Sequence, residues 1–199
     1  MPISQADLNL VFEIGNLRWI MRSWHRFGGI KFQNLTEHMY RVAWIALIIA
    51  KYEKVENTDR MLKMALIHDI SESRAGDVDY LSRQYVERKE KEGVKDMLTD
   101  TSLADELIDL WEEYEKRECI ESKIVKDADN IDVDFELREQ AYKGERLDEL
   151  WSEGRKFVAE NKLYTNTAKK IWKAVQTQNP HHWHSTAKTR FNSGDWRKI

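Results

Sequence analysis

Hydrophobic residues recur along much of this chain at alternating intervals of three and four, which is the spacing of one face of an α-helix. The clearest stripe consists of Leu35, Met39, Val42, Ala46 and Ile49. Similar stripes occupy residues 61–72, 103–114, 124–135 and 164–175. Weaker helical periodicity covers residues 5–21 and the charge-rich segment 82–97. No β-hairpin pattern interrupts these stripes, so the pattern predicts a set of packed helices.

Polar residues mark the ends of two of these predicted helices. Asn34 and Thr36 are both suitable N-caps for the first stripe, and Thr58 or Asp59 for the second. Gly76 lies where the second stripe stops, as expected of a residue that ends a helix. The second helix is therefore expected to run without a break past residue 72.

The composition fits a helical protein. The 199 residues include only two Pro and eight Gly, so few residues break helices. The length suits one domain with a substantial core. We predict an all-α, single-domain bundle of six to eight helices over residues 1–176, followed by an irregular C-terminal extension, residues 177–199.

Charge and cysteine content exclude several classes of protein. The 32 basic and 35 acidic side chains give a net charge of −3, so the chain is not a broadly basic nucleic-acid binder. Cys119 is the only cysteine, and no signal-peptide pattern opens the chain. The most apolar run, Val42 to Ala50, is far shorter than the roughly 20 residues that cross a bilayer. We expect a cytoplasmic protein with neither a membrane nor a nucleic acid as partner.

Ionisable residues appear where the second stripe turns from apolar to polar, and another lies beside the first stripe. His68 and Asp69 are adjacent in the second helix, Glu72 follows one turn later, and His38 lies at the core edge of the first helix. A lone His–Asp pair is more often structural, with a buried histidine and an exposed aspartate. A second histidine and further carboxylates favour a mixed nitrogen and oxygen ligand set, which suits a divalent ion such as Mn, Co, Fe, Ni or Zn, with Mg possible.

The fourth predicted helix contributes further acids in the segment KDADNIDVD. Its aspartates are Asp127, Asp129, Asp132 and Asp134. Spacing alone does not distinguish among them as a partner for the two histidines.

Three segments together resemble a known family. NLTEHMYRVAWIA, ALIHDISESRAGDV and LWEEYEKRECIESKIVKDADNID resemble the HD-domain phosphohydrolases, and among them the 5′-deoxynucleotidase-like branch, over about residues 15 to 145. The resemblance implies one divalent metal bound by His38, His68, Asp69 and Asp129. It is the resemblance, and not the spacing, that selects Asp129.

The same resemblance implies catalytic roles for two further acids. Glu72 would orient or deprotonate the attacking water, or hold a ligand histidine in the required tautomer. Asp77, which follows Gly76, would contact a hydroxyl of the substrate sugar or protonate the leaving oxygen.

Substrate-binding residues are expected upstream of the first histidine. In similar proteins an arginine contacts the phosphate and a tryptophan contacts the deoxyribose. Trp24 lies 14 residues before His38, as the tryptophan of those proteins does. We assign the phosphate to Arg22, although Arg18 and Arg26 compete for this role.

The resemblance implies a metal-dependent phosphomonoesterase that hydrolyses nucleoside 5′-monophosphates, mainly the 2′-deoxy forms, and that forms a homodimer. The same ligands would also suit a triphosphohydrolase of deoxynucleoside triphosphates or a cyclic-nucleotide phosphodiesterase. An alternative of another class is a module that binds metal and nucleotide without turnover.

Overall fold

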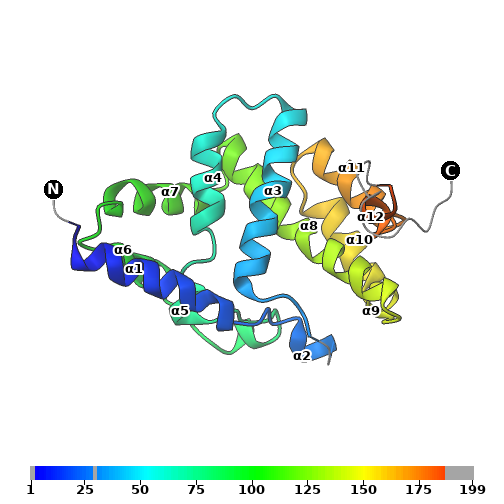
Figure 1. Ribbon diagram of the computed structural model, residues 1–199, viewed down its shortest axis with the longest axis horizontal. Helices are drawn as coiled ribbons and strands as arrows, with labels where there is room; N and C mark the ends of the chain where they lie inside the picture. Colours follow the sequence, from blue (N-terminus) through cyan, green and yellow to red (C-terminus); the bar gives the residue numbers. More distant parts are fainter. Residues whose placement is uncertain (1–2, 29–30, 187–199) are drawn as a thin grey trace, which may run out of the picture.

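A computed structural model describes residues 3–28 and 31–186, and within these ranges every regular element is a helix (Figure 1). The longer helices are α1 (Gln5–Asn16), α3 (Leu35–Glu53), α4 (Thr58–Ile67), α6 (Glu90–Leu98), α7 (Ala104–Lys116), α8 (Ile120–Tyr142), α10 (Ser152–Asn161) and α11 (Asn166–Val175). Single-turn helices are α2 (His25–Gly28), α5 (Glu72–Ala75), α9 (Leu147–Leu150) and α12 (His182–Ser185), and two 3₁₀ turns are η1 (Leu17–Trp19) and η2 (Ser82–Gln84). The all-α prediction is confirmed. The number of helices exceeds six to eight, because a single turn is too short to show periodicity.

Helix α8 is the central element of the bundle. It packs against α3, α4, α7 and α11, and α3 is its most extensive neighbour. The predicted stripes meet there: Val42 and Ile49 of α3 and Ile124 and Ile131 of α8 are all buried in one core. A smaller cluster of Phe32, Val133, Leu137 and Leu147 lies against the other half of α8, with two tryptophans packed on it.

The start of α3 is set by a reciprocal cap. The Asn34 side chain accepts a hydrogen bond from the Glu37 amide, and the Glu37 carboxylate accepts one from the Asn34 amide, both at 2.9 Å. Of the two caps that the sequence allowed, Asn34 therefore serves and Thr36 does not. This cap fixes the first turn of the helix that carries His38.

The second predicted helix is interrupted, which corrects the expectation of one unbroken helix. Its cap is Asn57, one residue earlier than expected, and α4 ends at Ile67. Residues 68–71 form turns before α5 begins at Glu72. Adjacent side chains diverge by about 100° on a continuous helix, so the break frees the His68–Asp69 pair to face one point. Gly76 ends α5 with φ of 73°, as its position predicted.

The charge-rich segment 82–97 is only partly helical. It contains η2, an irregular stretch, and the first part of α6.

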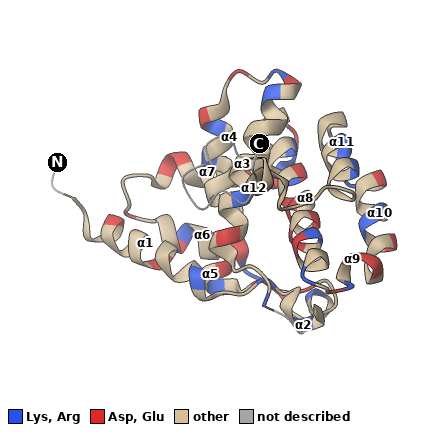
Figure 2. Cartoon of the chain, turned by 45° about the vertical axis from the view of Figure 1, so that its right-hand side comes forward, with Lys and Arg blue, Asp and Glu red and all other residues tan. Residues whose placement is uncertain are grey.

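Basic and acidic residues are interleaved along α8 and α10 (Figure 2). No helix in the described part of the chain is both long and apolar enough to cross a bilayer.

The C-terminal segment folds back onto α8 as far as it is described. The Arg138 side chain donates a hydrogen bond to the carbonyl of Gln178, and the rings of Tyr142 and His181 lie 6.2 Å apart. Residues 187–199 of the predicted extension lie outside the described ranges.

Candidate metal and active site

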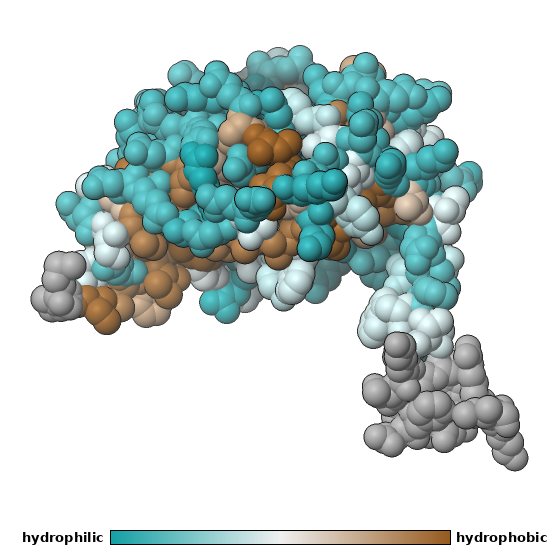
Figure 3. All heavy atoms as spheres, turned by 90° about the horizontal axis from the view of Figure 1, so that it is seen from above, coloured by the Kyte–Doolittle hydropathy of each residue, from teal (hydrophilic) through white to brown (hydrophobic). Residues whose placement is uncertain are grey.

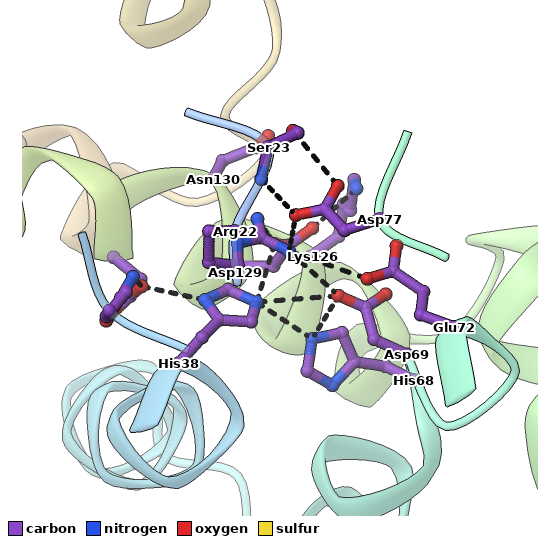
Figure 4. Close-up of polar contacts among 12 residues, drawn as sticks. Arg22, Ser23, His38, His68, Asp69, Glu72, Asp77, Lys126, Asp129 and Asn130 are labelled. Carbon is purple, nitrogen blue, oxygen red and sulfur yellow. Dashed lines mark hydrogen bonds and ion pairs between the residues drawn. The ribbon is translucent and has the colours of Figure 1, made fainter. Parts of the chain in front are cut away.

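Four ionisable side chains from three elements converge beside α8 (Figure 4). His38 comes from α3, His68 and Asp69 from the turn after α4, and Asp129 from α8. One potential ligand atom from each lies within 4.8 Å of the others. His38 Nε2 is 3.4 Å from Asp129 Oδ1 and 3.5 Å from Asp69 Oδ2. The structure thus brings together the four residues that the resemblance implied as ligands.

Hydrogen bonds fix which nitrogen of each histidine faces the others. His68 Nδ1 lies 2.8 Å from the Ala65 carbonyl, and His38 Nδ1 lies 2.7 Å from Asp132 Oδ2. A carbonyl and a carboxylate only accept, so Nδ1 is the donor in both rings. Both Nε2 lone pairs then point into the cluster, as metal-binding histidines require.

The electrostatics of the cluster favour a positive charge. Burial and the nearby Arg22 lower the pKa of His38, but hydrogen bonds to Asp129, Asp132 and Asp69 outweigh them and raise it to about 10. Burial raises the pKa of Asp129, whereas Lys126 and His38 lower it well below its usual value. Two imidazole nitrogens and two ionised carboxylates fit a divalent transition metal, and a metal would compete with a proton for the same lone pairs.

The four aspartates of α8 have four different environments. Asp127 accepts hydrogen bonds from the segment 164–165, at the start of α11. Asp132 bonds the first histidine of the cluster, and Asp134 pairs with an arginine of α10 and with a tryptophan indole of α11. Only Asp129 of the four offers an oxygen to the cluster. Spacing could not separate them, because α8 is buried on several sides and three of the four are structural.

Arg22 lies over the cluster and contacts four carboxylates. Its guanidinium is 3.2 Å from Asp77, 3.4 Å from Asp69, 3.9 Å from Glu72 and 4.0 Å from Asp129. Its Nε is buried without a hydrogen-bond partner. Such a planar cation, held beside the potential metal ligands, suits recognition of phosphate oxygens.

The two competing arginines lie elsewhere. Arg18 donates to the carbonyl of Gly15 at 2.6 Å. Arg26 donates to Asp79 at 2.8 Å and to Ser82 at 2.7 Å. Among the three arginines that the sequence left open, only Arg22 contacts the carboxylates of the cluster.

The two expected catalytic acids flank Arg22. Glu72 is 3% exposed, and its Oε2 has no hydrogen-bond partner. Burial raises its pKa to about 9, with Asp69 and Asp77 adding to the effect. Asp77 accepts hydrogen bonds from the amide and hydroxyl of Ser23, at 3.0 and 3.1 Å. A buried carboxyl group beside the potential metal ligands, with one oxygen free of hydrogen bonds, is placed to exchange a proton with water.

A cavity of about 310 Å³ opens beside the cluster, within the size range of small-molecule sites. Trp24 lines it and also packs edge-on against Trp151, with ring centroids 4.7 Å apart. The indole is therefore both a wall of the cavity and part of the smaller hydrophobic cluster.

Several residues at the site were not predicted from the sequence. Lys126 pairs with Asp129 at 2.6 Å from one turn away on α8, and Asn130 also lines the cavity. Asp132 and Arg41 lie behind His38, with Arg41 Nε 2.6 Å from Asp132 Oδ1. The available signal was helical spacing, since Arg41 follows His38 by three residues and Asp132 follows Asp129 by three.

Comparison with known sequences finds one family. The model of the HD domain family matches residues 14–172. The chain is 33% identical over 132 residues to 5′-deoxynucleotidase HDDC2 of Danio rerio, a match that covers 63% of this chain and 65% of that one. It is 32% identical over 144 residues to the HDDC2 protein of Dictyostelium discoideum, covering 66% and 74%. The match thus spans just under two thirds of the Danio rerio protein.

Solved structures share the fold. A conserved hypothetical protein from Pyrococcus furiosus superposes with a TM-score of 0.71 at 28% identity, over 86% of this chain and 99% of that one. A protein from Magnetospirillum magnetotacticum, described as a predicted metal-dependent phosphohydrolase, superposes with a TM-score of 0.63 at 24% identity, over 85% and 91%. At that identity the second likeness concerns the fold alone.

Proposed function

Because the chain belongs to the HD domain family, in its 5′-deoxynucleotidase-like branch, we propose that it hydrolyses nucleoside 5′-monophosphates, mainly the 2′-deoxy forms, to nucleoside and phosphate. The observation that carries this proposal is the four-residue cluster of two histidines and two aspartates, with Arg22 beside it. A cavity of nucleotide-binding size adjoins both. The relatives named 5′-deoxynucleotidase support the substrate class.

His38, His68, Asp69 and Asp129 would hold one divalent ion, drawn from Mn, Co, Fe, Ni, Zn or Mg. When bound, such an ion lowers the pKa of a coordinated water and offsets charge on the phosphoryl group. Their mixed nitrogen and oxygen donors favour a first-row transition metal over calcium.

The remaining residues of the site would position and move protons. Arg22 would bind the phosphate oxygens through its guanidinium fork. Glu72, with one carboxylate oxygen free of hydrogen bonds, would accept a proton from the attacking water. Asp77 would bind a sugar hydroxyl or donate a proton to the leaving oxygen, while the Ser23 bonds hold it in place.

Trp24 would contact the deoxyribose. Its indole lines the cavity and is held by the Trp151 ring, so it has little freedom to move away from a larger sugar. A rigid wall of this kind discriminates against an added 2′-hydroxyl by leaving it no room and no partner.

We also propose a homodimer located in the cytoplasm, with neither nucleic acid nor membrane as a partner. Support for the dimer comes from large apolar side chains on one line of α3, which are Tyr40, Trp44, Ile48 and Tyr52. They are 67%, 55%, 48% and 73% exposed. We call this set the α3 stripe. Exposed apolar surface of this kind is typical of protein interfaces.

The test separates metal binding from turnover. In Asp69→Ala we expect metal occupancy to fall, because a ligand is lost. In Glu72→Ala we expect occupancy to stay and hydrolysis of dAMP to fall by about 100-fold or more, the usual contribution of a general base. Asp105→Ala, on the exposed first turn of α7, is the matched control and should change neither quantity. Variants of Asp69 and Glu72 that both hydrolyse dAMP like the parent would refute the proposal.

A further inference from the structure

Two short segments form the rim of the cavity, and three pairs of side chains or backbone groups join one segment to the other. One is residues 22–28, which includes α2, and the other is residues 77–83, which follows α5. In order of increasing residue number in both segments, the contacts are Ser23 with Asp77, Arg26 with Asp79 and Phe27 with Tyr80. The first two are polar, at 3.0 and 2.8 Å. The third is a stacked pair of rings, with centroids 5.6 Å apart and planes inclined by 25°.

Because the first contact is polar and the last is between two aromatic rings, the rim has a charged end and an aromatic end. Arg22 and Asp77 belong to the charged end, where they contact each other and the metal-ligand cluster. Phe27 and Tyr80 form the aromatic end, as the last contacting pair along both segments. All of these residues line one cavity, together with Asp69 of the cluster. A ligand with an anionic end and a flat apolar end would match this order.

The aromatic end is open to solvent. Phe27 is 38% exposed and Tyr80 is 71% exposed, unlike the buried aromatic rings of the core. The guanidinium carbon of Arg26 lies over the Phe27 ring, 5.7 Å from its centroid, and its charge is paired with Asp79. The two rings are thus held by their neighbours while part of each remains exposed for another planar group.

We propose that the Phe27–Tyr80 pair is the subsite for the nucleobase of the substrate. This inference rests on the proposed nucleotidase function and extends it, because that function by itself assigns no residue to the base. With the phosphate at Arg22 and the sugar at Trp24, the base lies toward the outer end of the rim. Stacking tolerates every base, since each has a π-face, so the subsite accepts all four and favours the larger purines.

The experiment compares two ligands that differ only in the base. Binding of dAMP and of 2-deoxyribose 5-phosphate, which has no base, is measured by calorimetry, and KM for each is measured with Mn²⁺ or Co²⁺ present. In Tyr80→Ala and Phe27→Ala we expect Kd and KM for dAMP to rise about tenfold, the scale of one lost base stack. The constants for 2-deoxyribose 5-phosphate should stay within twofold of the parent.

Two further variants control for structural effects. Tyr80→Phe keeps the ring and should bind dAMP like the parent. Tyr85→Ala removes a similarly exposed ring that also lies between α5 and α6 but does not line the cavity, and it should also leave dAMP binding unchanged.

The outcomes separate this inference from the proposed function. Equal losses for both ligands, or no loss for either, would overturn the nucleobase subsite, and so would a parent protein that binds dAMP no better than 2-deoxyribose 5-phosphate. A parent that binds dAMP through both rings and releases no phosphate would support the subsite and refute the nucleotidase activity.

Discussion

The imidazole of His38 is held on both edges by one helix. Asp129 Oδ1 lies 3.4 Å from its Nε2, and Asp132 Oδ2 lies 2.7 Å from its Nδ1. The two aspartates are three residues apart on α8, so a single helix face carries both. Asp132 is fully buried, and it also accepts hydrogen bonds from Arg41 and Gln33. Its position is therefore determined from three sides.

We predict that Asp132→Asn weakens metal binding about 10- to 100-fold, as loss of a partner behind a metal-binding histidine commonly does. An amide can donate to Nδ1, which would move the ring proton to Nε2, the atom that would bind the ion. Competition with a fluorescent chelator, using Co²⁺ or Zn²⁺, would measure the affinity.

Asp127→Asn is the control for this prediction. Asp127 is equally buried on the same helix, yet it bonds the segment 164–165 and no metal-site residue. This variant should lose stability and keep its metal affinity. Equal affinities in Asp132→Asn and the parent would show that Asp132 has no positioning role.

At this scale the sequence predicted the residue types better than their individual roles. The two histidines and Asp69 stood out because they interrupt apolar stripes. Choosing Asp129 required the family resemblance, because burial on several sides of α8 removes the contrast between an inner and an outer face. Helical spacing places Arg41 near His38 and Asp132 near Asp129, but it does not report the contact between Arg41 and Asp132, which are 91 positions apart.

Among the elements, α3 and the break between α4 and α5 do most to bring His38, His68 and Asp69 into the cluster. The apolar stripe of α3 predicted its buried face correctly, and His38 lies on that face. The break after Ile67 was not predicted, because the residues through Glu72 continue the helical spacing. The chain departs from its local pattern where His68 and Asp69 turn toward the cluster, as expected where function and local preference conflict.

The cap of α3 gives a prediction at this scale. We expect Asn34→Ala to lower the free energy of unfolding by about 1 kcal/mol, because one amide of the first turn loses its acceptor and the reciprocal cap is broken. Denaturation by urea would measure it. Asn34→Asp keeps a capping oxygen and should retain most of the stability. If Asn34→Ala were as stable as the parent, the cap would be incidental to the fold.

At the scale of the whole molecule, exposed large apolar side chains occur on many elements, with runs of them on α1 and α3. Figure 3 shows brown atoms at the lower left and in a band across the middle of the view. Exposed apolar residues lie on α1, including Val11 and Phe12, and on the α3 stripe. Because α3 also carries His38, an interface at the α3 stripe would stabilise the helix that positions this histidine.

We predict that Trp44→Glu shifts the protein from dimer to monomer in sedimentation velocity, since a buried unpaired charge opposes association. Phe157→Glu, at a similarly exposed position of α10, is the control and should leave the dimer intact. A parent protein that sediments as a monomer at micromolar concentration would contradict the proposed homodimer.

The boundary at residue 176 stays a prediction. The contacts of Gln178 and His181 with α8 tie the described part of the C-terminal segment to the bundle. The single domain itself follows from few helix breakers and from one main core that α3, α4, α7, α8 and α11 share. Length and composition were sufficient to predict a single domain, because both are properties of the whole chain and do not depend on any one contact.

We predict that this cluster of two histidines and two aspartates hydrolyses a nucleoside monophosphate. The most direct measurement incubates the purified protein, with Mn²⁺ or Co²⁺, separately with dAMP and with dATP, and identifies the products by chromatography. We predict deoxyadenosine and free phosphate from dAMP, and no tripolyphosphate from dATP. Tripolyphosphate from dATP, with no phosphate from dAMP, would contradict monophosphate hydrolysis and assign the site to triphosphohydrolysis.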